Sequence, residues 1–129
     1  DPEAMNNLGY FLADHNIRLD EANQLITRAL KKSPKAPHII DSAAWVAYRQ
    51  NDLDKALMLA QQAHQLSDAP DIALHLAEIL WVKGDAHAAR QLFTMLKSLP
   101  AGQSNEEIQT LLNETIKRLG VSLTEPTTP

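Results

Sequence analysis

Apolar residues recur at steps of three and four along most of the chain, the pattern of helices with one buried face. One such stripe consists of Ile39, Ile40, Ala43, Ala44, Ala47 and Tyr48. Four polar residues, 49–52, then interrupt it. A second stripe consists of Leu53, Ala56, Leu57, Ala60 and Ala63. Because the interruption is short, the pattern predicts two antiparallel helices joined as a hairpin, with small residues that allow close backbone approach.

This hairpin pattern recurs earlier and later in the chain. Ala56 lies in the segment DKAL, and its counterparts are Ala22 in the earlier segment DEANQL and Ala89 in the later segment HAARQL. The three alanines repeat with a period of about 34 residues, the length of one helix–turn–helix unit of a solenoid. A single hairpin leaves an apolar face uncovered, so three units in register predict a stack of hairpins.

The units resemble the tetratricopeptide repeat of bacterial proteins, whose pattern runs W-x2-L-G-x2-Y, then A-x3-F-x2-A, then Pro. The first copy matches at Met5, Leu8, Gly9, Leu12, Ala22, Ile26, Ala29 and Pro34. The second copy matches at Ile40, Ala43, Ala44, Ala47, Ala56, Ala60 and Ala63. The third copy matches at Ala73, Leu76, Ala77, Leu80, Ala89, Phe93 and Leu96. The second and third copies lack the first Trp and a clean closing Pro, and the resemblance covers about residues 2–100.

The resemblance implies an all-α fold, a right-handed superhelical solenoid of three helix–turn–helix hairpins with a C-terminal capping helix. We place the repeats at about 2–35, 36–68 and 69–101, and the capping helix at 104–120, within one domain of residues 1–120. Ser104 and Asn105 are candidate N-caps of the last helix, and Gly120 is its candidate C-cap. The Thr- and Pro-rich residues 121–129 are predicted to form a disordered tail. Since Asp1-Pro2 resembles a seam between two repeats, we expect the chain to be a piece of a longer solenoid.

Composition agrees with one all-helical domain and narrows the possible functions. The chain has 129 residues, of which 44% are hydrophobic and only 5% aromatic. No apolar run reaches the roughly 18–20 residues that span a bilayer. The chain contains no Cys, which excludes a disulfide framework. A net charge of −4 and a pI of about 5.7 disfavour a nucleic-acid surface.

The sequence contains no motif typical of catalysis, metal binding or cofactor binding. None of the five His residues belongs to an HExxH motif or accompanies a CxxC motif. The 4 Gly residues are scattered and form no phosphate-binding loop, and no Ser stands in a GxSxG setting. We therefore predict that the protein is not an enzyme and uses neither a metal nor another cofactor.

The resemblance also implies a binding surface, because the first helix of each such hairpin lines a concave groove. Carried over to this sequence, it implies a protein or peptide partner held by Asn6, Tyr10, His38, Asp41, Trp45, Tyr48, Arg49, Leu74, Glu78 and Trp81. We expect Tyr10 and Trp45 to be exposed, since their neighbours already fill the apolar stripe. For Tyr48 and Trp81, two interpretations stay open, exposure in the groove and packing between neighbouring first helices.

One subgroup of the family grips acidic C-terminal tails through Lys, Arg and Asn side chains. The corresponding positions here are Asn6, Tyr10, Ser42, Asp71 and His75. Only Asn6 suits such a clamp, so an acidic-tail receptor is not predicted.

Two alternatives to peptide binding are kept. If the first hairpin lacks a neighbour, its face around Met5 and Phe11 would be exposed and could form a homodimer. Helical-pair repeats of this length also bind RNA, but that interpretation requires basic first helices, and Asp71 and Glu78 are acidic. We rank RNA third and predict no nucleic-acid partner. The wording of the first repeat resembles bacterial proteins, some of them envelope-associated, and leaves the cytoplasm and the cell envelope open as compartments for a soluble fragment.

Overall fold

The computed structural model describes residues 1–100, 102–103 and 105–124. The described residues form seven α-helices and no strand. They divide into two compact units, Asp1–Asp68 and Ala69–Pro129, which are considered one at a time. The sequence predicted one domain over residues 1–120, and the structure divides it at the predicted boundary between the second and third hairpins.

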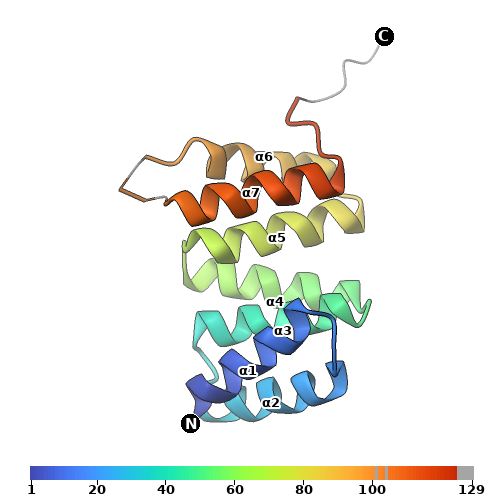
Figure 1. Cartoon of the computed structure of the whole chain (residues 1–129), viewed down its shortest axis with the longest axis vertical. Helices are drawn as coiled ribbons and strands as arrows, with labels where there is room; N and C mark the ends of the chain where they lie inside the picture. The colour runs from blue at the N-terminus through green and yellow to red at the C-terminus, as the bar shows by residue number, and fades with distance from the viewer. Residues whose placement is uncertain (101, 104, 125–129) are drawn as a thin grey trace. The chain divides into compact units, whose positions relative to one another are not determined.

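Unit 1 contains two helical hairpins. Their helices are α1 (Pro2–Asp14), α2 (Leu19–Lys32), α3 (Pro37–Arg49) and α4 (Leu53–Leu66). Figure 1 shows α1 beside α2, and α3 beside α4, while α3 also contacts both helices of the first hairpin. The unit therefore consists of two stacked hairpins with α3 at the seam between them.

The core of unit 1 forms where α1, α2 and α3 meet. It consists of Leu12, Ala13, Ala22, Ile26, Ala29, Ile39, Trp45 and Val46. Close contact between α1 and α2 depends on a missing side chain at Gly9. A Cβ atom there would lie 2.7 Å from Ile26 Cδ1 and 2.8 Å from Ile26 Cγ1, both below normal contact distance. The absence of a side chain at Gly9 on α1 thus makes room for Ile26 of α2.

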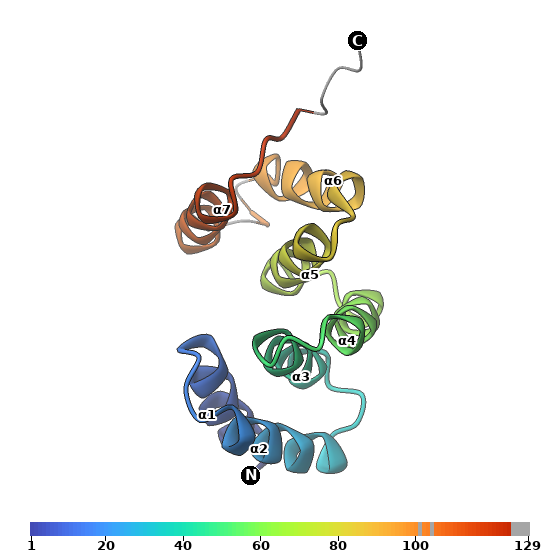
Figure 2. The ribbon, with the colours of Figure 1, turned by 90° about the vertical axis from the view of Figure 1, so that its right-hand side faces the viewer.

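Unit 2 contains the third hairpin and a further helix. Its helices are α5 (Pro70–Lys83), α6 (Ala86–Lys97) and α7 (Glu106–Leu119). Figure 2 shows α5 and α7 nearly end-on, and α7 contacts both α5 and α6. Phe93 and Leu96 from α6 and Leu112 from α7 are fully buried. The apolar stripe of α7 thus packs on the third hairpin.

The turns inside the second and third hairpins share one backbone design. Asn51 and Gly84 follow the first helix with φ of 64° and 105°, respectively. The next residues, Asp52 and Asp85, donate their N–H groups back to carbonyls of the helix just completed, which makes a Schellman motif. Each aspartate also begins the following helix, since its Oδ1 accepts from the N–H three residues on, at 3.4 Å for Asp52 and 3.2 Å for Asp85.

The first hairpin departs from this design because its link is longer. The link, residues 15–18, places both Asn16 and Arg18 at positive φ, 53° and 47°. Ile17 closes the Schellman motif by donating to Leu12 O, so Arg18 becomes the N-cap of α2 without a side-chain hydrogen bond. In the other hairpins a single aspartate both closes the Schellman motif and caps the next helix. In the first hairpin the extra residue divides these roles between Ile17 and Arg18.

The ends of α7 lie where the sequence placed them. Asn105 Oδ1 accepts from Ile108 N–H at 2.8 Å, which confirms Asn105 as the N-cap, and Gly120 ends the helix with φ of 69°. The other candidate, Ser104, lies outside the described residues. The predicted disordered tail differs from the structure at its start, because Val121 is buried and the Ser122 carbonyl accepts from Arg90 Nε at 2.7 Å. Residues 125–129 lie outside the described part of the chain.

Candidate functional site in unit 1

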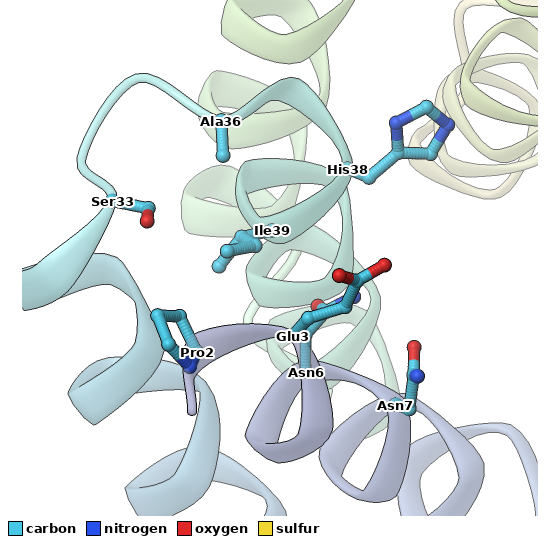
Figure 3. A pocket seen from close by; sticks show the side chains of 8 residues that line it. All are labelled: Pro2, Glu3, Asn6, Asn7, Ser33, Ala36, His38 and Ile39. Carbon is cyan, nitrogen blue, oxygen red and sulfur yellow. The ribbon is translucent and has the colours of Figure 1, made fainter.

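The first turns of α1 and α3 border a pocket of about 530 Å³ (Figure 3). Both helices begin with proline, Pro2 and Pro37, since a residue with φ fixed at about −65° and no N–H group suits the first helical position. The lining comes from α1, from the link after α2 and from α3. It consists of Pro2, Glu3, Asn6, Asn7, Ser33, Ala36, His38 and Ile39.

The α1 side of the pocket is polar. Glu3 and Asn6 are three residues apart, so their side chains lie on the same face of the helix, and Figure 3 shows both extending from α1 toward α3. Asn6 Oδ1 is buried and has no hydrogen-bond partner among the described residues. A buried acceptor without a donor costs about 1–3 kcal/mol. The unpaired acceptor is therefore a local cost to the stability of unit 1.

Two of the predicted partner-binding residues lie in this pocket, and three others lie elsewhere in unit 1. Asn6 and His38 are part of its lining. Tyr10 and Tyr48 are half-buried and pack against the core of unit 1, so their rings serve the fold as well as the surface. Arg49 lies over the aromatic rings of α3, with its guanidinium carbon 5.1 Å from the Trp45 ring centroid and 6.0 Å from that of Tyr48.

The expectation of an exposed Trp45 is wrong. Its side chain is only 3% exposed and belongs to the core of unit 1. The indole Nε1–H donates to Asp14 Oδ1 at 3.2 Å, and the indole ring lies 4.9 Å from the Tyr48 ring. The physical reason is the position of α3 against α1, which turns this residue into the seam between hairpins rather than toward solvent.

Three further predicted residues are also buried. Asp41, Leu74 and Glu78 are 3%, 6% and 3% exposed, so they offer almost no side-chain surface to a partner. For Glu78 the structure gives the cause. Arg118 of α7 donates to both carboxylate oxygens, through Nη2 to Oε1 at 2.6 Å and through Nη1 to Oε2 at 3.2 Å. Glu78 therefore links α5 to α7 through this ion pair. Its prediction as a groove contact is wrong.

Trp81, the last predicted residue, belongs to unit 2. It is half-buried, and the Arg90 guanidinium carbon lies 5.3 Å from its ring centroid. Arg90 Nε also donates to the Ser122 carbonyl oxygen. The indole thus combines a packing role on α5 with a cation–π contact to α6.

The pocket also includes Glu3, Asn7 and Ser33, which the predicted set does not contain. Ser33 lies in the link between two repeats, a region outside the groove positions that the family pattern supplies. The sequence did carry a signal, since Pro2 and Pro37 mark the starts of the two helices whose first turns border the pocket. Among the described residues, no group of three or more His, Cys, Asp or Glu side chains could hold a metal ion.

Comparisons with known proteins show which proteins the chain is similar to. No protein-family model matches the chain. A stretch of 75 residues, 58% of this chain, is 44% identical to the TPR repeat-containing protein PA4667 of Pseudomonas aeruginosa. This stretch of the chain is similar to a tetratricopeptide-repeat protein. This match spans 13% of the length of the relative, so the chain corresponds to a small part of it.

Solved structures agree on the fold. The Sgt2 TPR domain from Aspergillus fumigatus matches 99% of this chain and 87% of its own, with a TM-score of 0.70 and 15% identity. A structure of Pseudomonas aeruginosa pilF matches 93% of this chain and 54% of its own, with a TM-score of 0.64 and 20% identity. The predicted all-α helical repeat fold is confirmed.

Tetratricopeptide repeats generally mediate protein–protein interactions, and proteins built from them are generally non-catalytic scaffolds. In the described ranges of this chain, no helix has the length and apolarity to cross a bilayer.

Proposed function

We propose that this tetratricopeptide-repeat domain holds a short segment of a partner protein in the pocket between the first turns of α1 and α3. The observation that carries the proposal is a pocket of about 530 Å³ whose lining comes from two neighbouring hairpins and combines apolar with polar side chains. Pockets of about 300–1,000 Å³ suit small ligands and a few side chains of a peptide.

The chemistry of the pocket favours a segment with both apolar and polar contacts. Pro2, Ala36 and Ile39 supply apolar surface. Ile39 belongs to the core of unit 1, so its position in the lining is fixed. Asn6 and His38 supply polar groups from two different repeats. A segment bound here would contact two hairpins at once, which is how a stack of repeats gains specificity.

Site-specific crosslinking tests the proposal. A photoreactive amino acid at Asn7, an exposed lining residue, is expected to capture the partner, whereas the same group at Gln61, exposed on α4, is not. Once the partner is purified, Asn6→Ala should weaken its binding about tenfold or more, while Gln61→Ala should leave it unchanged. Equal capture at both positions, or normal binding by Asn6→Ala, would refute the assignment of this pocket.

Self-association is a second candidate, favoured by the outer face of α1. Leu8 and Phe11 are 47% and 52% exposed and lie three residues apart on one helical face. The repeat period aligns them with Ser42 and Trp45, each only 3% exposed. Sedimentation velocity over a range of concentrations tests this candidate. A dimer that Phe11→Ser converts to a monomer would support it, and a monomer at every concentration would refute it.

A further inference from the structure

We propose that the C-terminal half of α2 and the link after it bind an acidic segment of a partner protein. The surface consists of four exposed cations, Arg28, Lys31, Lys32 and Lys35, and is called the basic surface. It lies outside the pocket between α1 and α3 and is independent of the function proposed for that pocket.

The basic surface stands out against the charge of the whole chain. Residues 22–40 contain four of the 12 Lys and Arg residues and none of the 16 Asp and Glu residues. The rest of the chain is therefore more acidic than the net charge of −4 suggests. Arg28, Lys31 and Lys32 are three and four residues apart, so they project from one side of α2, which lies along an edge of unit 1 (Figure 1).

The four cations have no partners within the described part of the chain, where none of their side chains takes part in a hydrogen bond or an ion pair. The preceding cation, Arg18, differs in that it lies 3.9 Å from the carboxylate of Glu21. Glu21 precedes Arg28 by seven residues, about 10 Å along the helix axis, which is about one Debye length at 0.1 M salt. The basic surface is therefore only weakly screened by the acidic start of its own helix.

The helix dipole explains part of this arrangement. Lys31 and Lys32 lie in the last turn of α2, where cations offset the negative end of the dipole. Arg28 and Lys35 lie outside that turn. Their contribution to the surface is therefore additional charge that the fold of α2 does not require.

Three classes of polyanion complement such a surface, and two of them need features that it lacks. Single-stranded nucleic acids stack on aromatic side chains, and residues 22–36 contain none. Membrane-surface helices insert apolar side chains beside their cations. Here Leu25 and Leu30 pack against the core of unit 1, and residues 22–36 include no large exposed apolar side chain. An acidic protein segment needs neither feature, and tetratricopeptide repeats generally mediate protein–protein interactions.

The spacing of the cations favours an extended segment. Arg28 and Lys32 are one helical turn apart, about 6 Å along the axis. In an extended chain, side chains on the same side follow one another at about 6.6–6.8 Å. A segment that runs along α2 with carboxylates at alternate positions would therefore place one carboxylate near each cation.

The pocket limits the basic surface on one side. Ser33 and Ala36, which flank Lys35 in the link, line the pocket together with Glu3. The carboxylate of Glu3 repels an acidic segment from this direction. We therefore place the segment along the outer side of α2 and not in the pocket.

Nuclear magnetic resonance of the 15N-labelled chain at low salt tests the inference with two probe peptides. One peptide has four glutamates that alternate with glycines, and the other has glutamines in their place. We expect the glutamate peptide to shift the amide signals of Arg28, Lys31, Lys32 and Lys35. The glutamine peptide should bind at least about fivefold more weakly, because one exposed ion pair contributes up to about fivefold in affinity. An increase from about 50 to about 500 mM salt should remove most of the binding of the glutamate peptide.

Two double variants locate the effect. Arg28→Gln with Lys32→Gln should weaken binding of the glutamate peptide at least about fivefold. Lys55→Gln with Lys117→Gln removes the same charge from exposed positions of α4 and α7 and should leave this binding unchanged. Since all four positions are exposed, both variants should keep the far-ultraviolet circular dichroism of the native chain.

Several results would overturn the inference. They are equal binding of the two peptides, shifts confined to other parts of the chain, and an equal loss of binding in the two double variants. Tighter binding of a thymidine pentanucleotide, which carries four phosphates, or of phosphatidylserine vesicles would replace the acidic protein segment by another class of partner. The pocket has its own test, the crosslinking at Asn7, so the two proposals can fail separately.

Discussion

Trp45 gives the sharpest test of how unit 1 is built, because the sequence and the structure assign it opposite roles. As an exposed groove residue, it could be replaced by Ala with loss of binding and no loss of stability. As a core residue hydrogen-bonded to Asp14, it cannot be replaced by Ala without a loss of stability. We predict that Trp45→Ala strongly destabilises unit 1.

The magnitude follows from the burial of the indole. A buried Trp removes about 150–250 Å² from water, which at about 25 cal/mol per Å² corresponds to about 4–6 kcal/mol. Measured Trp→Ala changes in cores cost about 3–5 kcal/mol. The lost hydrogen bond adds little, since the Asp14 side chain is 45% exposed and water can replace the indole N–H. We therefore expect a loss of about 3–5 kcal/mol in the free energy of unfolding.

Urea unfolding followed by far-ultraviolet circular dichroism measures this loss without depending on Trp fluorescence. A domain the size of unit 1 loses about 4–8 °C in Tm per kcal/mol, so the thermal midpoint should fall by at least about 12 °C. Trp45→Phe, which keeps an aromatic ring but lacks the N–H donor, should recover more than half of the loss.

Phe11→Ala is the matched control, since Phe11 occupies the equivalent repeat position but is 52% exposed. It should change stability by no more than about 0.5 kcal/mol. If Trp45→Ala unfolds like the native chain, then α3 does not pack on the first hairpin through this indole, and the reasoning fails.

Three further substitutions test other parts of the fold, each by urea unfolding. Gly9→Ala should cost about 1–2 kcal/mol through overpacking against Ile26, net of its gain in helix propensity, and a smaller cost in an Ile26→Val background would confirm the contact. Arg118→Met should cost about 2 kcal/mol by removing the charged donor to buried Glu78. Its double variant with Glu78→Leu should cost less than Arg118→Met alone, and a double variant that costs more would refute this. Gly84→Ala should cost about 1 kcal/mol through its positive φ of 105° alone, since a Cβ atom at this position would have no atom within 4 Å; Gly84→Asn should cost less, and an Ala variant as stable as the native chain would contradict the turn geometry.

Most of the helical framework could be predicted from the sequence because its causes are local. The spacing of small apolar residues predicted the helices, and the proline at each hairpin's start marked where α1, α3 and α5 begin. Asn105 and Gly120 bounded α7 for equally local reasons, a side-chain cap and a left-handed backbone conformation. Such features depend on a few consecutive residues, so a sequence is enough to show them.

The site was harder to predict because burial depends on residues far apart in the chain. Trp45 is fixed by Asp14, 31 residues away, and Glu78 is fixed by Arg118, 40 residues away. The family pattern gives the positions of a first helix that face the groove in an average repeat. It does not show which of these positions are buried by a neighbouring helix in this chain. Only Asn6 and His38 were both predicted and found in the pocket.

One repeat position shows how the same backbone site takes different roles. The repeat period aligns Phe11, Trp45 and Glu78. Phe11 is exposed, Trp45 joins two hairpins through its indole, and Glu78 joins α5 to α7 through a bidentate ion pair. The large side chains at Trp45 and Glu78 therefore serve cohesion within each unit rather than recognition. In the function proposed above, the partner would instead contact the smaller polar groups at the first turns of α1 and α3.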